Sequence, residues 1–214
     1  MTSKHFKLSK IMQKTIQIFL LLAAVFTLSF SVENGGGGYK IGDTAQDFKL
    51  KNVNGKKVSL ASIKNAKGYI VVFTCNECPY AKAYEQRIIE LHQKYAPMGF
   101  SVVAINSNDK NVQPGDSFEQ MKKLAKQKKY PFPYLYDESQ EVAKTFGATR
   151  TPHVYVLDKD RVVRYIGAID DNSEEPAMAK EKYVGNAVDA LLSGKEVSVK
   201  ETKAIGCGIK WRKG

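Results

Sequence analysis

The chain has 214 residues, 43% of them hydrophobic and 26% charged, with three cysteines and a formal net charge of +11 at pH 7. This length and composition indicate one globular domain with a sizeable core plus some extra chain. The positive charge is not typical of nucleic-acid binding, because the lysines are scattered and no recognition motif or interleaved aromatic residues accompany them. We therefore expect a solvated basic surface and no nucleic-acid partner.

The first 31 residues have the pattern of a targeting segment. Residues 1–15 contain four lysines and no acid, and residues 16–30 form an almost uninterrupted apolar run that ends among small residues. The pattern predicts a signal peptide or, because the run approaches the length of a membrane span, a membrane anchor through residues 16–32. Residues 32–38 then form a glycine-rich spacer. We expect an exported protein, periplasmic or otherwise extracytoplasmic, and leave open whether the segment is cleaved.

The first elements after the spacer are predicted to be a β-hairpin and a βαβ unit. Two short alternating runs, 48–50 and 57–60, flank the turn signal Asn54-Gly55. Residues 68–73 and 100–105 are apolar runs typical of buried strands, and the segment between them has apolar residues every three or four positions, as in a helix. A right-handed connection would make these two strands parallel neighbours.

Helices and strands alternate through the rest of the domain, which we place at residues 39–193. Asp116 and Glu119 have the spacing of a capping box that opens a lysine-rich helix ending near Gln127. The other expected elements are a short segment at 134–136, a helix at 139–146, two antiparallel strands at 154–157 and 162–166, and a helix at 181–193. A basic tail at 194–214 carries the third cysteine.

Two cysteines, Cys75 and Cys78, follow the strand at 68–73 and open the next helix. The unpaired N–H groups and positive dipole end of a helix N-terminus stabilise a thiolate, and Pro79 is tolerated in a first helical turn. The pattern predicts a redox dithiol in which Cys75 faces solvent, has the lower pKa and attacks, while Cys78 is shielded by Pro79 and the core and resolves the mixed disulfide. Glu77 would oppose thiolate formation, or it is simply a solvated first-turn acid.

The pair Thr151-Pro152 is the second informative motif. Proline directly before an apolar strand removes a ladder donor, so the pair predicts a special turn with a cis peptide bond. Together with the Cys-x-x-Cys motif before it and the hairpin and helix after it, this pair makes residues 39–193 resemble the thioredoxin-like superfamily. Residues 41–50 and Asn54-Gly55-Lys56 resemble, more closely, the N-terminal hairpin of the branch that contains peroxiredoxins, the alkyl hydroperoxide reductase and thiol-specific antioxidant proteins, and extracytoplasmic thiol-disulfide reductases.

This resemblance implies an α/β fold with a central mixed β-sheet flanked by helices. It also implies that the Thr151-Pro152 loop faces the cysteines and binds the backbone of a substrate. The chain departs from thioredoxins at Thr74, where they have tryptophan, and it lacks their buried acid in the strand at 68–73. We therefore expect Glu77, Glu85 or water to manage protons.

A peroxiredoxin-like thiol peroxidase is the first alternative. Cys78-Pro79 resembles the Cys-Pro of peroxidatic sites, and Arg150 lies roughly where those enzymes keep an arginine. The pattern Pro-x-x-x-Thr-x-x-Cys, however, fits neither cysteine: Val72 stands three residues before Cys75. Disulfide exchange is therefore the preferred reaction.

A non-enzymatic metal protein is the second alternative. Cys75, Cys78 and Cys207 with one histidine would form a zinc site, and two thiolates with a histidine would suit copper(I). His153 follows Pro152 and is the candidate ligand, whereas His92 is expected on the outer side of its helix. The motif spacing argues against copper, and His153 is better explained as a strand residue.

Cys207 lies between two glycines, which give the backbone freedom to approach another sulfur. It would either resolve a disulfide on Cys75, pack as a small core residue or form an intermolecular bridge. In sum, the sequence predicts a thiol-disulfide oxidoreductase that acts on protein or small-molecule disulfides with a thiol electron donor. No cofactor and no metal are required.

Overall fold

The structure is a computed structural model, and it describes residues 37–213. The predicted targeting segment at 1–31 lies outside the described residues. Among residues 37–213, no helix is both long enough and apolar enough to cross a membrane.

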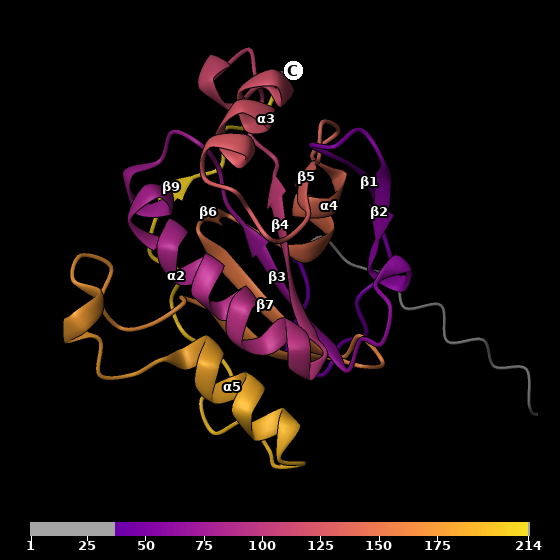
Figure 1. Cartoon of the computed structure of the whole chain (residues 1–214), viewed down its shortest axis with the longest axis vertical. Helices are drawn as coiled ribbons and strands as arrows, with labels where there is room; N and C mark the ends of the chain where they lie inside the picture. The colour runs from indigo at the N-terminus through magenta and orange to yellow at the C-terminus, as the bar shows by residue number, and fades with distance from the viewer. Residues whose placement is uncertain (1–36, 214) are drawn as a thin grey trace, which may run out of the picture. The chain divides into compact units, whose positions relative to one another are not determined.

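Seven strands form one mixed sheet in the order β2-β1-β5-β4-β3-β7-β8 (Figure 1). The three strands β3, β4 and β5 are parallel, and every other neighbouring pair is antiparallel. The strands are β1 Lys49–Asn52, β2 Lys57–Ser59, β3 Gly68–Phe73, β4 Phe100–Asn106, β5 Tyr134–Tyr136, β7 His153–Asp158 and β8 Val163–Gly167. The expected hairpin, the parallel β3–β4 pair and the antiparallel β7–β8 pair are all confirmed.

Four α-helices, four short 3-10 helices and a small second sheet complete the described chain. The α-helices are α2 Pro79–Tyr95, α3 Phe118–Gln127, α4 Glu141–Phe146 and α5 Tyr183–Leu192, and the 3-10 helices are η1 Leu60–Ser62, η2 Ala96–Met98, η3 Pro114–Asp116 and η4 Pro176–Met178. The second sheet pairs β6 Arg150–Thr151 with β9 Cys207–Gly208. The predicted α/β fold with a central mixed sheet flanked by helices is thus confirmed.

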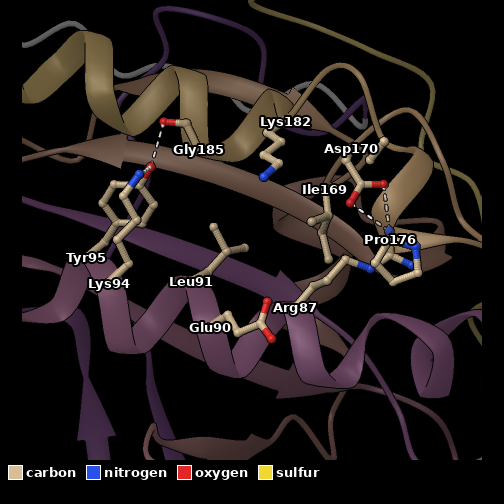
Figure 2. Close-up of a pocket in the computed structure, with 11 residues that line it drawn as sticks. Arg87, Glu90, Leu91, Lys94, Tyr95, Ile169, Asp170, Pro176, Lys182 and Gly185 are labelled. Carbon is tan, nitrogen blue, oxygen red and sulfur yellow. Dashed lines mark hydrogen bonds and ion pairs between the residues drawn. The ribbon is translucent and has the colours of Figure 1, made fainter.

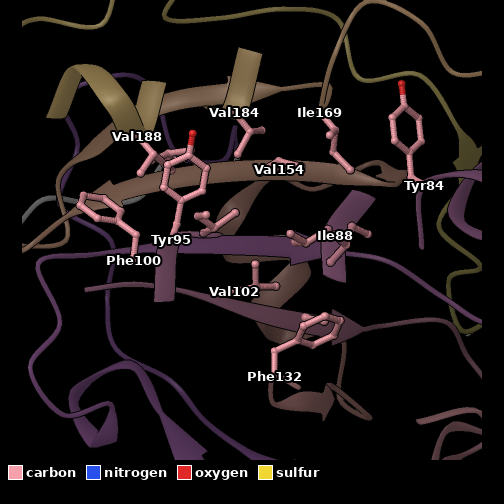
Figure 3. Packing of buried hydrophobic residues seen from close by; sticks show 14 of the residues in the cluster. Tyr84, Ile88, Tyr95, Phe100, Val102, Phe132, Val154, Ile169, Val184 and Val188 are labelled. Atoms are coloured by element: carbon pink, nitrogen blue, oxygen red, sulfur yellow. The ribbon is translucent and has the colours of Figure 1, made fainter. Parts of the chain in front are cut away.

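The central strand β3 is buried along its whole length because both faces of the sheet are covered. Ile70 and Val72 point to the face covered by α2, α3 and α5, and Val71 and Phe73 point to the face covered by α4. Figure 3 shows the first face, where α2 and α5 side chains meet the strands. An uninterrupted apolar run of this kind is typical of a strand in a sheet covered on both sides.

Helix α2 begins directly after the second cysteine of the motif. Cys78 is its N-cap, and Pro79 occupies the first helical position, where its missing N–H is not needed. The helix buries one apolar face on the sheet and ends before Gly99, which has a φ of 97°. The predicted helix is therefore confirmed, and it fixes the position of the second sulfur.

The predicted capping box at Asp116 and Glu119 is wrong. Helix α3 begins after Ser117, and no side chain caps its N-terminus. Asp116 ends the preceding 3-10 helix η3 and is fully buried. Its carboxylate accepts the N–H of Asn76, between the cysteines, instead of an N–H of the helix.

Candidate functional site

The two motif cysteines lie in the loop that joins the central strand β3 to α2. The loop continues the sheet for one residue, because the Thr74 N–H donates to the Ile105 carbonyl of β4 at 2.8 Å. Cys75 and Cys78 are 6% and 5% exposed, so neither sulfur is freely accessible. The expectation that Cys75 faces solvent is therefore wrong.

The Thr151-Pro152 loop faces both sulfurs, and its peptide bond is cis, as predicted. Cys75 Sγ lies 3.3 Å from Thr151 Oγ1, and Cys78 Sγ lies 3.1 Å from the Thr151 carbonyl oxygen, both within hydrogen-bonding distance for sulfur. The structure thus brings together the four residues that the sequence predicted to form the redox and substrate-binding centre.

The surroundings shift the pKa values of the two thiols in opposite directions, and these directions are the reverse of the expected ones. A hydrogen bond with Cys78, burial and the nearby charge of Asp116 raise the pKa of Cys75. The hydrogen bond from Cys75 lowers the pKa of Cys78 to about 4 despite burial, with further donation from Cys207 and the Ala81 N–H. The Thr151 carbonyl opposes this shift, but the helix N-cap position and several donors outweigh one acceptor. These donors and the helix N-terminus favour ionisation of Cys78 over ionisation of Cys75.

A buried polar network supports the loop between the cysteines, and the sequence did not reveal it. The Asn76 N–H donates to Asp116 Oδ1, and the Asn76 side chain donates to the Gly115 carbonyl at 2.7 Å. Asp116 also accepts from Asn106 at 3.2 Å and from Asn108 at 2.7 Å. The only sequence signal was the concentration of Asn and Asp in residues 106–116, after the end of β4.

Burial raises the pKa of Asp116, although hydrogen bonds from Asn108 and Asn76 oppose this effect. Asp116 is therefore a buried acid near the cysteines, although it lies in η3 and not in the strand at 68–73, where thioredoxins have theirs. The sequence offered Glu77 and Glu85 for this role, but Glu77 is exposed and lies 3.5 Å from Lys82. Glu85 binds Lys128 at 2.6 Å. Asp116 is thus an acid that lies buried beside the loop between the cysteines.

Arg150 and His153, which were predicted near the site, form no hydrogen bond with either motif sulfur in the described residues. Arg150 is exposed on β6, and within residues 37–213 its guanidinium makes no hydrogen bond to a sulfur. His153 is buried in β7, accepts the Thr149 N–H at 3.4 Å and packs on Tyr155. Burial lowers the pKa of His153 to about 4, so its ring is neutral near pH 7.

A metal site is not assembled in the part of the chain that the structure describes. No group of three or more His, Cys, Asp or Glu side chains there is arranged to hold a metal ion. The second histidine considered, His92, was expected on the outer side of α2. It is instead half-buried, and its ring accepts the Val102 N–H at 3.2 Å.

Cys207 does reach the dithiol. It packs against the small cluster formed by Cys75, Cys78 and Ala81, and it is one of the groups that lower the pKa of Cys78. A pocket of about 240 Å³ opens over the three sulfurs, lined by Cys75, Glu77, Cys78, Pro79, Asn108, Gln113, Asp116, Cys207 and Lys210. This volume admits a small reactant directly to a thiolate.

A second pocket, of about 230 Å³, lies along the middle of α2 and contains no cysteine (Figure 2). Its floor is a buried ion pair in which Arg87 contacts Asp170 at 2.7 Å. The same guanidinium lies 3.8 Å from the centre of the Tyr84 ring. Because no cysteine lines it, this pocket is not a second thiol redox centre.

The fold and the site define a thioredoxin-like thiol redox protein. The sequence pattern of the AhpC/TSA family matches residues 41–166, more than half of the chain, and the protein belongs to that family. A peroxiredoxin Q from Sedum lineare is 30% identical over 159 residues, which are 71% of this chain and 77% of that protein.

Relatives with a different activity match about equally well. The thiol-disulfide oxidoreductase ResA of Bacillus thuringiensis subsp. konkukian is 26% identical over 155 residues, covering 72% of this chain and 85% of that protein. An uncharacterized conserved protein from Geobacillus kaustophilus has a crystal structure that is 42% identical, with a TM-score of 0.77 over 82% of this chain and 94% of that one. The family is thus established, while its members divide between disulfide exchange and peroxide reduction.

Proposed function

We propose that the protein is an extracytoplasmic thiol-disulfide oxidoreductase whose redox couple is Cys75 and Cys78. The observation that carries the proposal is the contact of both sulfurs with Thr151 in the cis-proline loop. The substrates are protein or small-molecule disulfides, and a thiol donor restores the reduced protein. The relationship to ResA, a protein named for this activity, supports the proposal.

We assign the attacking role to the cysteine whose pKa is lowered, Cys78. Since the thiolate is the nucleophile in disulfide exchange, Cys78 attacks one sulfur of the substrate disulfide and the other sulfur leaves as a thiolate. Cys75 then loses its proton, attacks Cys78 and releases the second substrate thiolate. These proposed roles are opposite to those that the motif alone suggested, because the surroundings lower the pKa of Cys78 and raise that of Cys75.

Asp116 is the group we assign to proton transfer during resolution. Its carboxyl group is buried, its pKa is raised, and its charge acts on Cys75. An acid with a raised pKa accepts a proton more readily near neutral pH than an exposed one does. It thus offsets the cost of ionising Cys75 inside the protein.

Thiol peroxidase activity is the second candidate, favoured by one observation. The lowered pKa is that of Cys78, which is followed by Pro79 at the start of α2, the position that resembles a peroxidatic cysteine. The exposed Arg150 supports it less, because no arginine is hydrogen-bonded to the sulfurs in the described chain. Disulfide exchange remains the better proposal.

The test compares the reduced protein's rate constants for a model protein disulfide and for hydrogen peroxide at equal concentration. We expect faster reaction with the disulfide. Cys78→Ser should abolish the reaction, and the double variant Cys75→Ser/Cys207→Ser should hold a mixed disulfide that a reductant releases. A peroxide rate constant far above that of free cysteine, retained in Cys75→Ser, would establish the peroxidase instead.

The order of alkylation tests the assignment of roles. At mildly acidic pH, iodoacetamide should modify Cys78 before Cys75, because only Cys78 is ionised there. If Cys75 is modified first, Cys75 is the attacking thiol and Cys78 resolves.

We further propose that residues 1–31 direct export and that residues 16–32 tether the protein to a membrane if they are not removed. Their lysines, apolar run and small residues support this proposal. Protease accessibility in intact cells against lysed cells tests it: protection in intact spheroplasts would place the domain in the cytoplasm.

A further inference from the structure

The C-terminal segment forms a strand on the edge of the cis-proline loop. Strand β9 pairs antiparallel with β6, so that Cys207 lies opposite Thr151 and Gly208 opposite Arg150 (Figure 1). The Ile209 N–H extends this pairing to the Thr149 carbonyl at 3.1 Å. A strand in this position uses the backbone groups that an incoming peptide would need for strand addition.

The approach of this strand depends on a glycine. A Cβ atom at Gly206 would lie 2.2 Å from the Thr151 carbonyl oxygen, far inside any van der Waals contact. A Cβ atom at Gly208 would lie 4.0 Å from the Arg150 guanidinium and meets nothing closer. The two glycines therefore provide a matched pair of positions, one that requires the absence of a side chain and one that does not.

Contacts on both sides of Cys207 hold the strand in place. Downstream, Ile209 is buried, and the Lys210 carbonyl accepts from the Asp109 N–H at 2.8 Å. Upstream, Thr202 binds the end of β8 through its N–H, which donates to the Ile166 carbonyl at 2.9 Å. A segment fixed at both ends presents its side chains at a defined place.

The strand places Cys207 beside the two motif cysteines. Cys207 packs on Cys78 and Ala81, and it is more exposed than either motif cysteine. Cys207 also lines the same pocket as Cys75 and Cys78. Cys78 thus has a thiol on each side, Cys75 within the motif and Cys207 on the tail.

We infer that β9 is a built-in substitute for a substrate strand and that Cys207 is a second resolving thiol, which forms a disulfide with Cys78. This inference rests on the proposed function, because it concerns the fate of the mixed disulfide on Cys78. It also specifies the substrates: a small disulfide enters the pocket beside β9, whereas an extended polypeptide must displace β9 from Thr151.

The reaction balances without any further reactant. Cys78 attacks a small disulfide R–S–S–R, one R–S⁻ leaves and takes a proton, and Cys78 carries the remaining R–S group. Cys207 loses its proton to solvent and attacks the Cys78 sulfur, which releases the second R–S⁻. Two protein thiols are oxidised to one disulfide, and the substrate disulfide is reduced to two thiols.

The experiment uses Cys75→Ser, which leaves only Cys78 and Cys207. The variant is treated with oxidised glutathione and analysed by non-reducing peptide mapping. We expect a Cys78–Cys207 disulfide in most molecules and little glutathione adduct. A stable adduct on Cys78 with a free Cys207 would overturn the inference.

Variants at the two glycines test whether the strand is responsible. In the Cys75→Ser background, Gly206→Ala should slow formation of the Cys78–Cys207 disulfide by about tenfold or more, because fixed proximity is lost. Gly208→Ala should leave the rate nearly unchanged. Equal rates in both variants would show that β9 pairing does not position Cys207, and would overturn the inference.

Treatment with diamide, which oxidises neighbouring dithiols, separates this inference from the proposed function. If oxidised glutathione does not react but diamide links Cys78 to Cys207, the proposed function fails and the pairing stands. If glutathione modifies Cys78 and neither reagent links it to Cys207, the proposed function stands and the inference fails.

Discussion

Two buried aspartates lie beside helix α2, and they are neutralised in different ways. Asp170, against the middle of the helix, contacts Arg87 at 2.7 Å and accepts from the Tyr84 hydroxyl at 2.9 Å. Within residues 37–213, the side chain of Asp116, beside the cysteines, accepts hydrogen bonds only from uncharged amide groups of Asn76, Asn106 and Asn108. One carboxylate has a cationic partner, and the other does not.

The different partners of Asp170 and Asp116 suit one aspartate to a structural role and the other to proton exchange. An aspartate in close contact with an arginine anchors the segment that carries it. An aspartate stabilised by amides alone retains a raised pKa and can exchange a proton under working conditions. The same residue type therefore holds the α2–β8 region together in one place and serves the dithiol in the other.

Breaking the ion pair should have the largest effect on stability. Arg87→Met leaves the Asp170 carboxylate buried without a cation, which should reduce the free energy of unfolding by about 3–5 kcal/mol. The rate of disulfide exchange per folded molecule should not change, because the pair lies outside the cysteine pocket. Urea unfolding and a disulfide-exchange assay measure the two quantities.

The double variant Arg87→Met/Asp170→Leu is the matched control for that prediction. Removing both charges should recover much of the lost stability, since no uncompensated charge remains. If the single variant loses less than about 1 kcal/mol, Asp170 does not depend on Arg87, and the contrast with Asp116 disappears.

Asp116→Asn should have a smaller effect on stability and a specific effect on the dithiol. The lost acceptor costs about 1–2 kcal/mol, partly offset by removal of a buried charge. Because the charge of Asp116 raises the pKa of Cys75, the variant should have a lower Cys75 pKa, seen in ultraviolet thiolate titration. An unchanged Cys75 titration would contradict the assigned role of Asp116.

The pH dependence of stability gives an independent readout of Asp116. Since burial raises its pKa in the folded state, its stabilising contribution is present below the unfolded value of about 3.9 and is lost as the pH rises through the folded value. The stability of Asp116→Asn relative to wild type should therefore improve as the pH rises from 4 towards 7. A constant difference would mean that Asp116 does not titrate in this range.

Glu77→Gln should have the smallest effect. Glu77 and Lys82 are 3.5 Å apart and largely exposed, so the pair contributes no more than about 0.5 kcal/mol. The charge of Glu77 is a minor cause of the raised pKa of Asp116, so the substitution should lower that pKa slightly. Urea unfolding across the same pH range measures both effects. A loss above about 1 kcal/mol would show that Glu77 belongs to the buried network.

The sequence predicted the sheet well because local patterns determine its main elements. The apolar run 68–73 and the helix after Cys78 depend on neighbouring residues, and both were located within one or two positions. The same reasoning misassigned Asp116, because its true partner Asn76 lies 40 residues earlier in the chain. Local spacing to Glu119 looked like a cap, and no local feature revealed the distant contact.

The candidate site was predicted in part for the same reason. The identity of the two cysteines and of the Thr151-Pro152 loop can be read from motifs. Which of the two cysteines has the lower pKa depends on hydrogen-bond donors from α2 and from the tail, and only the fold brings these donors together. Strand β9 has two residues and no periodicity, so its pairing with β6 has no sequence signal beyond the glycines around Cys207.

The burial of β3 also determines where the site can move. This strand has hydrogen-bonded neighbours on both sides and all six residues are buried, so its amides should exchange with solvent only through global unfolding. The loop with Cys75 is attached to the end of this strand and is constrained with it. Local opening that admits a bulky partner must therefore occur at strand β9. This strand has two residues and can separate from β6 while the rest of the protein stays folded.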